Sequence, residues 1–432
     1  MLAILGYGMV ITFMVLIMSK RMTAFTALVL TPIVFGLIGG FGLDLGKFAL
    51  TGVKSLAPTA VMLLFAILYF GLMINVGLFD PLVNWIVKVV KGDPLKVIVG
   101  TAIMSAVVSL DGDGSTTIMI VVSAMLPLYK RLKINPLILA SILIMQNSIM
   151  NIIPWGGPTA RVMSVLNLDV KEIMAPFIPA MILAVLYVIG VAYYIGKRER
   201  KKLGITHLDQ KTMDEMASTV SEEELALKRP KLLWVNFIMT ILVMVALIKE
   251  VAPSSIIFLV AAALALLINY PSIKTQRDLI DMHAGNALQV VVMVLAAGVF
   301  MGILTESGMA DAIAENLISI IPESMGSHFP LITAIISIPG TFFLSNDAFY
   351  FGILPVLAET GAVYGFSSLQ IGVASLMGQA FHLLSPLVGS IYLLLQLTDV
   401  DMGEWQRYVA KWAIGIFAIF VATAVVIGFM PL

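Results

Sequence analysis

Two aspartates interrupt an apolar stretch of the chain, in the sequence SLDGDGSTT that begins at Ser109. Asp111 and Asp113 are separated by one glycine, and the segments on either side, 97–108 and 118–128, contain no charged residue. An Asp-Gly pair in a soluble loop usually forms a turn. Carboxylates in a partly dry site can instead bind a cation when ionised and carry a proton when neutral. Which interpretation holds depends on the surroundings that the rest of the chain provides.

The composition indicates that these surroundings are a lipid bilayer. The chain has 432 residues, of which 60% are hydrophobic and only 12% are charged, and its mean hydropathy is +1.02. Apolar runs of roughly 20 residues, the length that crosses a bilayer as a helix, recur from end to end. The chain has no cysteine, which excludes disulfide and thiolate chemistry. We therefore expect an all-α, multi-pass protein of the cell membrane, with no nucleic acid among its partners.

Most of the apolar runs are expected to cross the membrane, and two are expected to enter it and return. The crossing runs lie near 2–19, 23–41, 57–79, 136–166, 174–196, 232–249, 254–271, 285–306, 367–398 and 405–430. The stretches 94–128 and 329–358 are each broken in the middle. Their arms of about 15 apolar residues are short for a full crossing, so we interpret them as re-entrant helical hairpins. With both termini outside, most Lys and Arg residues fall in cytoplasmic loops, as does the polar segment 197–231.

The sequence of the first half recurs in the second. FGLMINVGLFD, from Phe70, resembles MGILTESGMAD, from Met301, and PWGGPT, from Pro154, resembles PLVGSI, from Pro386, at nearly the same spacing. Each half would contain five crossings, including one broken helix, together with one hairpin, and an odd number of crossings inverts the second half in the membrane. We expect 1–196 and 232–432 to be two inverted membrane repeats joined by the cytoplasmic linker 197–231. Paired broken helices in inverted repeats are typical of secondary transporters.

Polar residues inside the apolar segments gather at the hairpin tips and at the helix breaks. Irregular backbone at membrane depth is tolerated only where it lines a cavity or is buried in protein. The candidate cation ligands are Asp111, Asp113 and Asp347, and the candidate proton carriers are Asp113, Asp347 and His382. The candidate substrate-binding residues are Ser115, Thr116, Gly156, Gly157, Thr159, Arg161, Ser345, Asn346, Ser385, Gly389 and Ser390. Helix N-termini at these points would favour an anion.

Several of these residues also have a simpler interpretation. Proline and glycine at a break can produce only a kink, and His382 can be a packed polar residue. Arg161 can extend to the membrane surface, as long basic side chains do. Arg161 is nevertheless the one Lys or Arg residue expected away from the first or last turns of the crossing runs, and its planar guanidinium suits a carboxylate.

The segments APTAVMLLFAILYFGLMINVGLFDP, SLDGDGSTT and NIIPWGGPTAR resemble the citrate–metal:proton symporter (CitMHS) family of the ion-transporter superfamily, over nearly the whole chain. The resemblance implies uptake of citrate complexed with a divalent metal of the magnesium or calcium class, together with protons. It also implies a homodimer in which each protomer has a scaffold domain and a transport domain that moves as an elevator. Ser115, Thr116, Ser345 and Asn346 fall where relatives have Ser-Asn-Thr tips. At the first tip Asp-Gly-Asp-Gly replaces that motif, which favours protons or a metal over sodium.

Other functions stay open at the level of sequence. One is a symporter for gluconate or a free di- or tricarboxylate, with sodium as an alternative driving ion, and another is a channel. An intramembrane aspartyl protease would pair Asp113 with Asp347, but the duplication favours transport and no HExxH or GxSxG motif is present. We therefore do not expect an enzyme. The register of the tips is also open, with Ser345 opposite either Ser115 or Thr117.

Overall fold

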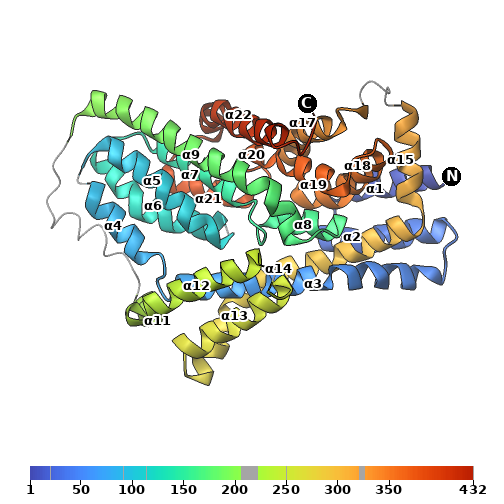
Figure 1. The fold of residues 1–432 in the computed structure, drawn as a ribbon, viewed down its shortest axis with the longest axis horizontal. Helices are drawn as coiled ribbons and strands as arrows, with labels where there is room; N and C mark the ends of the chain where they lie inside the picture. The colour runs from blue at the N-terminus through green and yellow to red at the C-terminus, as the bar shows by residue number, and fades with distance from the viewer. Residues whose placement is uncertain are drawn as a thin grey trace.

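The computed structural model describes residues 1–19, 21–90, 92–112, 114–205, 222–249, 251–320 and 326–431, and the described chain is built from helices (Figure 1). The first half contains α1 (Leu2–Met18), α2 (Ala24–Ile38), α3 (Asp44–Asn75), α4 (Asp80–Val90), α5 (Pro94–Val108), η1 (Ser109–Asp111), α6 (Gly114–Arg131), α7 (Pro136–Met150), α8 (Gly157–Leu166) and α9 (Val170–Leu203). The short elements α11 (Glu222–Leu227) and η2 (Pro230–Leu232) precede the second half. The second half contains α12 (Leu233–Ile248), α13 (Ser254–Asn269), α14 (Ile273–Glu306), α15 (Met309–Ile320), α17 (Phe329–Phe343), η3 (Ala348–Ile353), α18 (Leu354–Val363), α19 (Ser368–Leu376), α20 (Gln379–His382), α21 (Gly389–Thr398) and α22 (Met402–Val426).

Elements of the second half repeat the lengths and the ends of elements in the first. Helices α5 and α17 have 15 residues each, and α8 and α21 have 10 residues each. The residues that end α8 and α21, Asn167 and Asp399, are both left-handed, with φ of 51° and 54°. Residues other than glycine rarely take this conformation. Its recurrence at the same place in both halves supports an internal duplication.

Each expected hairpin is present as two helices joined by a short tip. In the first, α5 leads through the 3-10 turn η1 to Gly112, whose φ of 77° reverses the chain before α6. In the second, α17 ends at Phe343, and the π-helical turn η3 begins the returning arm and continues into α18. Single π turns are found mostly inside α-helices and frequently at functional sites. The tip of the second hairpin therefore has an irregular backbone, as its sequence predicts.

The two interrupted runs are helices that stop and restart. Helix α7 ends at Met150 and α8 begins at Gly157, whereas α20 ends at His382 and α21 begins at Gly389. Glycine is required just before α8, because a Cβ atom at Gly156 would lie 2.0 Å from the carbonyl oxygen of Asn151. The first break therefore depends on close contact between two stretches of backbone.

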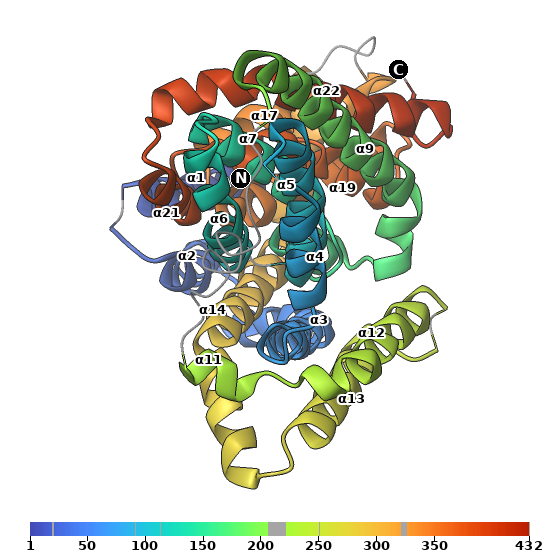
Figure 2. The ribbon, with the colours of Figure 1, turned by 90° about the vertical axis from the view of Figure 1, so that its left-hand side faces the viewer.

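Helices α3 and α14 pack against each other in antiparallel fashion. Gly52 of α3 faces Gly298 and Gly302 of α14 at one end of the contact, and Gly71 faces His283 at the other. A Cβ atom at Gly52 would lie 1.9 Å from the carbonyl oxygen of Gly298, so the two backbones touch. In both views these helices lie with α12 and α13 on one side of the molecule, and the hairpins, broken helices, α9 and α22 lie on the other (Figures 1 and 2).

Five described helical segments are long and apolar enough to cross a membrane: Asp44–Asn75, Val170–Leu203, Pro230–Leu247, Ala287–Glu306 and Met402–Val426. Helices α3 and α14 both begin well before the apolar runs that the sequence marks near 57–79 and 285–306. The added turns of α14 carry exposed charged residues, among them Asp278. A helix can continue from the bilayer into water without a change of backbone, so hydropathy marks the apolar part and not the helix end.

The residues between α11 and η2 are tied to the junction of α3 and α4. Gly77, with φ of 82°, turns the chain between these two helices, and Asp80 at the start of α4 forms an ion pair with Lys228. The neighbouring Arg229 donates from Nε to the carbonyl oxygen of Asn269, at the end of α13, at 2.9 Å. We call Leu227, Lys228 and Arg229 the linker strap, because this segment connects the turn between α3 and α4 in the first half to α13 in the second.

Candidate functional site

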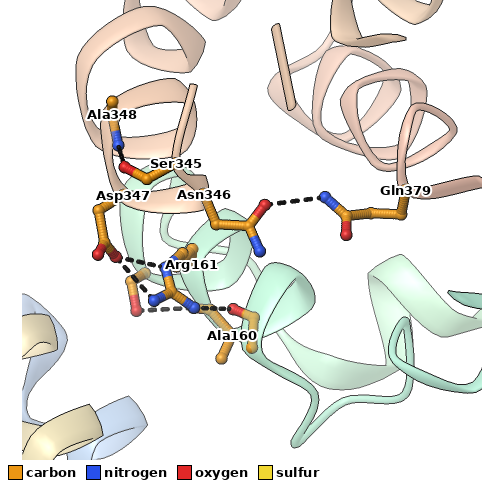
Figure 3. A network of polar contacts seen from close by, with 9 residues as sticks. Ala160, Arg161, Ser345, Asn346, Asp347, Ala348 and Gln379 are labelled. Carbon is orange, nitrogen blue, oxygen red and sulfur yellow. Dashed lines mark hydrogen bonds and ion pairs between the residues drawn. The ribbon is translucent and has the colours of Figure 1, made fainter. Parts of the chain in front are cut away.

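An ion pair joins the second hairpin tip to α8 (Figure 3). Arg161, on the second turn of α8, donates from Nε to Oδ1 of Asp347 at 2.8 Å, and its Nη2 lies 2.7 Å from the same oxygen. Asp347 is the residue directly before η3. The pair therefore connects the two halves of the chain, and it brings together the predicted anion ligand and one of the predicted cation ligands.

The guanidinium of Arg161 is held by more than the carboxylate. Its Nη1 donates to the carbonyl oxygen of Gly157, one turn earlier in α8, at 2.8 Å. The ring of Phe351, in η3, lies 5.9 Å from the central carbon of the guanidinium, a distance typical of a cation–π contact. These contacts fix the plane of the guanidinium, and a fixed planar fork is the geometry that recognises a carboxylate.

The ion pair is mostly buried but keeps some exposure to solvent. The side chains of Arg161 and Asp347 are each 19% exposed. Charges in this position are screened less by salt than surface charges are. Removing one partner of a fully buried pair costs about 3–5 kcal/mol, because the other charge is left uncompensated. The remaining exposure means that a solute can still reach both groups.

A chain of neutral side chains lies on the other side of the same tip. Gln379, the first residue of α20, donates from Nε2 to Oδ1 of Asn346 at 3.1 Å and to the hydroxyl of Tyr350 at 2.9 Å. In Figure 3, Asn346 points towards Gln379 whereas Asp347 points towards Arg161. Two consecutive residues of the tip therefore contact the broken helices of both halves.

Three other predicted residues of the second half hold backbone groups in place. Ser345 accepts a hydrogen bond from the first backbone N–H of η3 at 3.1 Å and so caps that turn. Nδ1 of His382 lies 2.7 Å from the carbonyl oxygen of Thr341, and Ser385 donates to the carbonyl oxygen of Phe342 at 2.5 Å. A carbonyl oxygen can only accept, so Nδ1 of His382 carries a proton. These contacts give the three residues structural roles, and their roles in binding or proton transfer stay predictions.

The first tip packs against Trp155 in the first break. Nε1 of Trp155 donates to the carbonyl oxygen of Leu110 at 2.9 Å. Gly112 lies against the indole, because a Cβ atom there would come within 3.0 Å of the ring. Trp155 is also stacked on Phe70 of α3, with ring centroids 4.9 Å apart and planes 22° apart. The tip, the break and α3 therefore meet at one indole.

The first tip also meets residues of both broken helices. A Cβ atom at Gly114, the first residue of α6, would lie 3.0 Å from Nδ2 of Asn147 in α7 and 3.6 Å from Oγ of Ser390 in α21. Ser115 and Thr116 follow in the same turn of α6. Ser390 is thus the predicted residue of the second half that approaches the first tip.

The predicted aspartate ligands are described only in part. Asp113 lies outside the described residues, and Asp111 is described by its backbone as the last residue of η1. Asp347 is engaged by Arg161. Within the ranges that the structure describes, no three His, Asp or Glu residues form a group that could hold a metal ion. A cation site made from the three aspartates therefore stays a prediction.

The contacts of the two tips support a third register. Gly114 faces Asn147 at the first tip, and Asn346 contacts Gln379 at the second. The separation in sequence between Gly114 and Asn346 equals that between Asn147 and Gln379. A register that aligns these pairs differs from both alignments that the sequence suggested, which compared serines and prolines.

Each of these amide residues keeps one unpaired atom. Nδ2 of Asn147 and Oε1 of Gln379 have no hydrogen-bond partner in the described part of the chain, although the two residues are only 4% and 1% exposed. A buried polar group without a partner costs about 1–3 kcal/mol, so it calls for a ligand or a water molecule. Gln379 and Tyr350 are absent from the sequence-based site. Gln379 lies one duplication spacing after Asn147, and this spacing is the signal in the sequence that could have identified it.

The remaining predicted residues shape the breaks. Thr159 donates from Oγ1 to the carbonyl oxygen of Ile152 at 2.6 Å, which closes the first break. Gly157 supplies the carbonyl that holds Arg161. Gly389 begins α21, and a Cβ atom there would meet nothing within 4 Å. The glycines of the two breaks are therefore not equally constrained.

Comparison with known proteins decides the family. Residues 13–378 match the sequence profile of CitMHS, described as "Citrate transporter". This chain belongs to the CitMHS family. The resemblance that the motifs indicate is thus confirmed.

Full-length relatives and a solved structure agree with this assignment. The CitMHS chain is 55% identical over 428 residues to a protein of Bacillus subtilis (strain 168) named "Citrate transporter", with 99% of both chains covered. It is 48% identical over 430 residues to the "Mg(2+)/citrate complex secondary transporter" of the same organism, again with 99% of both covered. The YdaH transporter of Alcanivorax borkumensis resembles it with a TM-score of 0.52 and 14% identity, over 91% of this chain and 89% of that one. The structural likeness shows a shared transporter fold.

Proposed function

We propose that this CitMHS chain is a secondary active transporter that imports citrate as a complex with a divalent metal and is driven by protons. The family and the named relatives support citrate as the substrate. The observation that carries the proposal is the contact between Arg161 and Asp347. It places a guanidinium, which suits a carboxylate, beside a carboxylate, which suits a cation.

A metal–citrate complex fits such a site better than free citrate. Free citrate carries about three negative charges at neutral pH, and a divalent cation cancels about two of them, which reduces the charge to be desolvated. Magnesium and calcium prefer oxygen ligands, and citrate supplies several, so the protein has to add few. We assign Asp347, with Asp111 and Asp113 at the other tip, to the cation side of the complex. Arg161 and the polar residues of tips and breaks are assigned to the citrate side.

The arrangement of helices supports an elevator mechanism. Helices α3 and α14 are equivalent in the duplication, yet they run antiparallel, as two inverted repeats would require. We assign α1–α3 and α12–α14 to a scaffold domain, and the hairpins, broken helices, α9 and α22 to a transport domain. In this assignment the repeats are 1–196 and 232–432, and the resemblance to the superfamily suggests that two scaffolds form a homodimer.

Proton coupling and orientation complete the proposal. Aspartates at the two tips, Asp113 and Asp347, are proposed to bind the driving protons, because carboxyl groups within membrane segments commonly serve as proton relays in transporters. His382 is a further candidate through Nε2, since its Nδ1 is engaged by Thr341. We assign 197–231 to the cytoplasm and both termini to the outside, and the distribution of Lys and Arg supports this assignment.

Uptake of radiolabelled citrate into proteoliposomes tests the substrate directly. Under an inward proton gradient, we expect accumulation with Mg²⁺ or Ca²⁺ present and none with excess chelator, because the carried species is the complex. Adding metal beyond the chelator should restore uptake, which controls for damage by the chelator. Undiminished uptake with chelator present would favour a symporter of the free anion, and accumulation under a sodium gradient alone would contradict proton coupling.

A further inference from the structure

The guanidinium of Arg161 is paired with a carboxylate that belongs to the protein itself, that of Asp347. We propose that Asp347 enforces the metal requirement: it holds the guanidinium of Arg161 in place of a citrate carboxylate, and only a citrate that brings a cation can displace it at low cost. This inference rests on the proposed function, since it assumes that citrate binds at Arg161. It adds the reason why the free anion would be refused.

The geometry shows direct competition for one edge of the guanidinium. Nε and Nη2 of Arg161, the two groups that would grip a ligand carboxylate, both contact Oδ1 of Asp347 at 2.8 and 2.7 Å. The remaining nitrogen, Nη1, donates to the carbonyl oxygen of Gly157. Nη1 and Nη2 each have one further N–H, but the edge formed by Nε and Nη2 is held by Asp347, so a citrate carboxylate that grips this edge must take the place of Asp347.

Displacement by free citrate would leave a carboxylate without a partner. Asp347 is only 19% exposed, so its charge would stay partly desolvated and close to the other carboxylates of citrate. Removing one partner of a buried pair leaves an uncompensated charge, which is strongly unfavourable, and nearby like charges add to that cost. Specificity of this kind comes from a repulsive element directed at the wrong ligand.

A metal–citrate complex turns the same displacement into an exchange of partners. The citrate carboxylate moves onto Arg161, and the divalent cation becomes the new partner of Asp347. Oδ2 of Asp347 accepts no hydrogen bond from the residues that the structure describes, so a cation can contact it before the pair opens. No charge is left alone at any stage of this exchange.

The ion pair of Arg161 and Asp347 occurs in one copy and is not repeated by the duplication. In the register that aligns Gly114 with Asn346, Asp347 is opposite Ser115 and Arg161 is opposite Leu393, so neither charge has a counterpart in the other half. The other contacts of the second tip do have counterparts, since Asn346 with Gln379 matches Gly114 with Asn147. A feature added to one half alone fits a role in selecting the ligand better than a role in forming the fold.

Binding measurements on the purified full chain in nanodiscs test the inference. Isothermal titration would compare citrate with excess chelator and citrate with excess Mg²⁺. For Asp347→Asn we expect free citrate to bind at least about tenfold more tightly than to the wild type, because Arg161 is no longer occupied by a charge. Mg²⁺–citrate should bind more weakly than to the wild type, so the preference for the complex should largely disappear. Asp278→Asn, the same change on the exposed end of α14, should leave both affinities unaltered.

Two further variants keep the test decisive. Asp347→Ser removes the charge and introduces serine, the residue at the aligned position Ser115. It should show the binding changes expected of Asp347→Asn, and it serves as the test if the asparagine variant folds poorly. Asp347→Glu keeps the charge and should keep the preference for the complex. An unchanged preference in the folded neutral variants, or its loss in the glutamate variant, would overturn the inference while leaving metal–citrate transport intact. Absence of citrate binding by the wild type under both conditions would instead overturn the proposed function.

Discussion

Arg161 has the charge and shape for a carboxylate ligand, and its surroundings keep both in one orientation. The carbonyl of Gly157 holds one nitrogen, the ring of Phe351 lies near the guanidinium, and Asp347 takes the edge formed by Nε and Nη2. An arginine that extended to the membrane surface would not be held by these three groups. The contacts therefore argue against the snorkelling interpretation, and the binding role of Arg161 stays a prediction.

A change of Arg161 to lysine tests whether shape matters as well as charge. Lys keeps the positive charge but loses the two parallel N–H groups, so we expect Arg161→Lys to weaken Mg²⁺–citrate binding about tenfold and Arg161→Ala about 100-fold. Titration calorimetry measures both. Arg407→Lys is a matched control, because exposed Arg407 also donates to a carbonyl four residues earlier. Near-normal affinity in Arg161→Ala would return the residue to a structural role.

Residue types at the site could be predicted from sequence, but their partners could not. Arg161 and Asp347 were identifiable because each is a charge in an apolar run. Gln379 could be found only by counting the spacing of the duplication from Asn147, and Tyr350 could not be found, because only its tertiary contact with Gln379 distinguishes it from other buried tyrosines. The ion pair itself joins positions in opposite halves of the chain, and no local pattern encodes that separation.

Among the elements, the two broken helices look alike in sequence but differ in how tightly they are packed. A Cβ atom at Gly156 would lie 2.0 Å from the carbonyl oxygen of Asn151, whereas one at Gly389 would meet nothing within 4 Å. Proline and glycine were sufficient to predict where both helices break. They were not sufficient to predict which glycine is indispensable, because that depends on how closely the chain passes its own preceding turn.

The difference between the breaks predicts opposite outcomes for the same substitution. Gly156→Ala should destabilise the protein by roughly 1–3 kcal/mol or more, because the added methyl group collides with backbone. Gly389→Ala should be neutral or slightly stabilising, since it adds a better helix former in open space. Thermal unfolding in detergent, followed by size-exclusion fluorescence, measures both. Equal melting temperatures for the two variants would contradict the packing described here.

The base of the first hairpin is fastened by Asp93, which caps α5 and pairs with Arg200 of α9. Its Oδ1 accepts the backbone N–H of Leu95 at 3.0 Å and Nε of Arg200 at 2.8 Å. Burial acts to raise the pKa of the Asp93 carboxyl, but the hydrogen bond from Arg200, and then that from Leu95, outweigh it and hold the pKa below its ordinary value. A carboxyl of this kind stabilises the folded protein only while it is ionised.

The lowered pKa of Asp93 predicts a stability difference that depends on pH. The stabilisation is fully present above the unfolded-state pKa of about 3.9 and is lost as the pH falls through the lower folded-state pKa. Wild type should therefore be more stable than Asp93→Asn at pH 6, and the gap in melting temperature should shrink towards pH 3. Asp401→Asn, at a cap of α22 formed with Glu404, is the control. A gap that stays constant with pH would show that the charge of Asp93 contributes nothing.

Taken as a whole, the described part of the molecule consists of two groups of helices, and aromatic side chains lie where they meet. Trp155 stacks on Phe70 and lies edge-on to Phe258, and Ser55 donates to Oδ1 of Asn167 at 3.2 Å. Aromatic faces in van der Waals contact can exchange neighbours more readily than an ion pair can. This interface suits the sliding that the proposed elevator requires, and sequence could not predict it because its partners, such as Trp155 and Phe70, lie far apart in the chain.

Cross-linking can test whether the two groups must separate during transport. The chain has no cysteine, so an introduced pair would be unique. Oxidation of Ser55→Cys with Asn167→Cys should reduce citrate uptake to background, and a reducing agent should restore it. Asn236→Cys with Asn269→Cys joins two helices of the proposed scaffold, at a site where the amides already pair at 2.8 Å, and should leave uptake unchanged. Continued uptake in the first cross-linked pair would contradict the elevator.

The linker strap anchors one of two turns that are equivalent in the duplication. Gly77 turns the chain between α3 and α4, and there Asp80 is held by Lys228. Gly308 makes the equivalent turn between α14 and α15 with φ of 72°, and a Cβ atom there would meet nothing within 4 Å. The two copies of this turn therefore differ in what anchors them, and the anchor at Gly77 comes from the segment that the duplication did not copy.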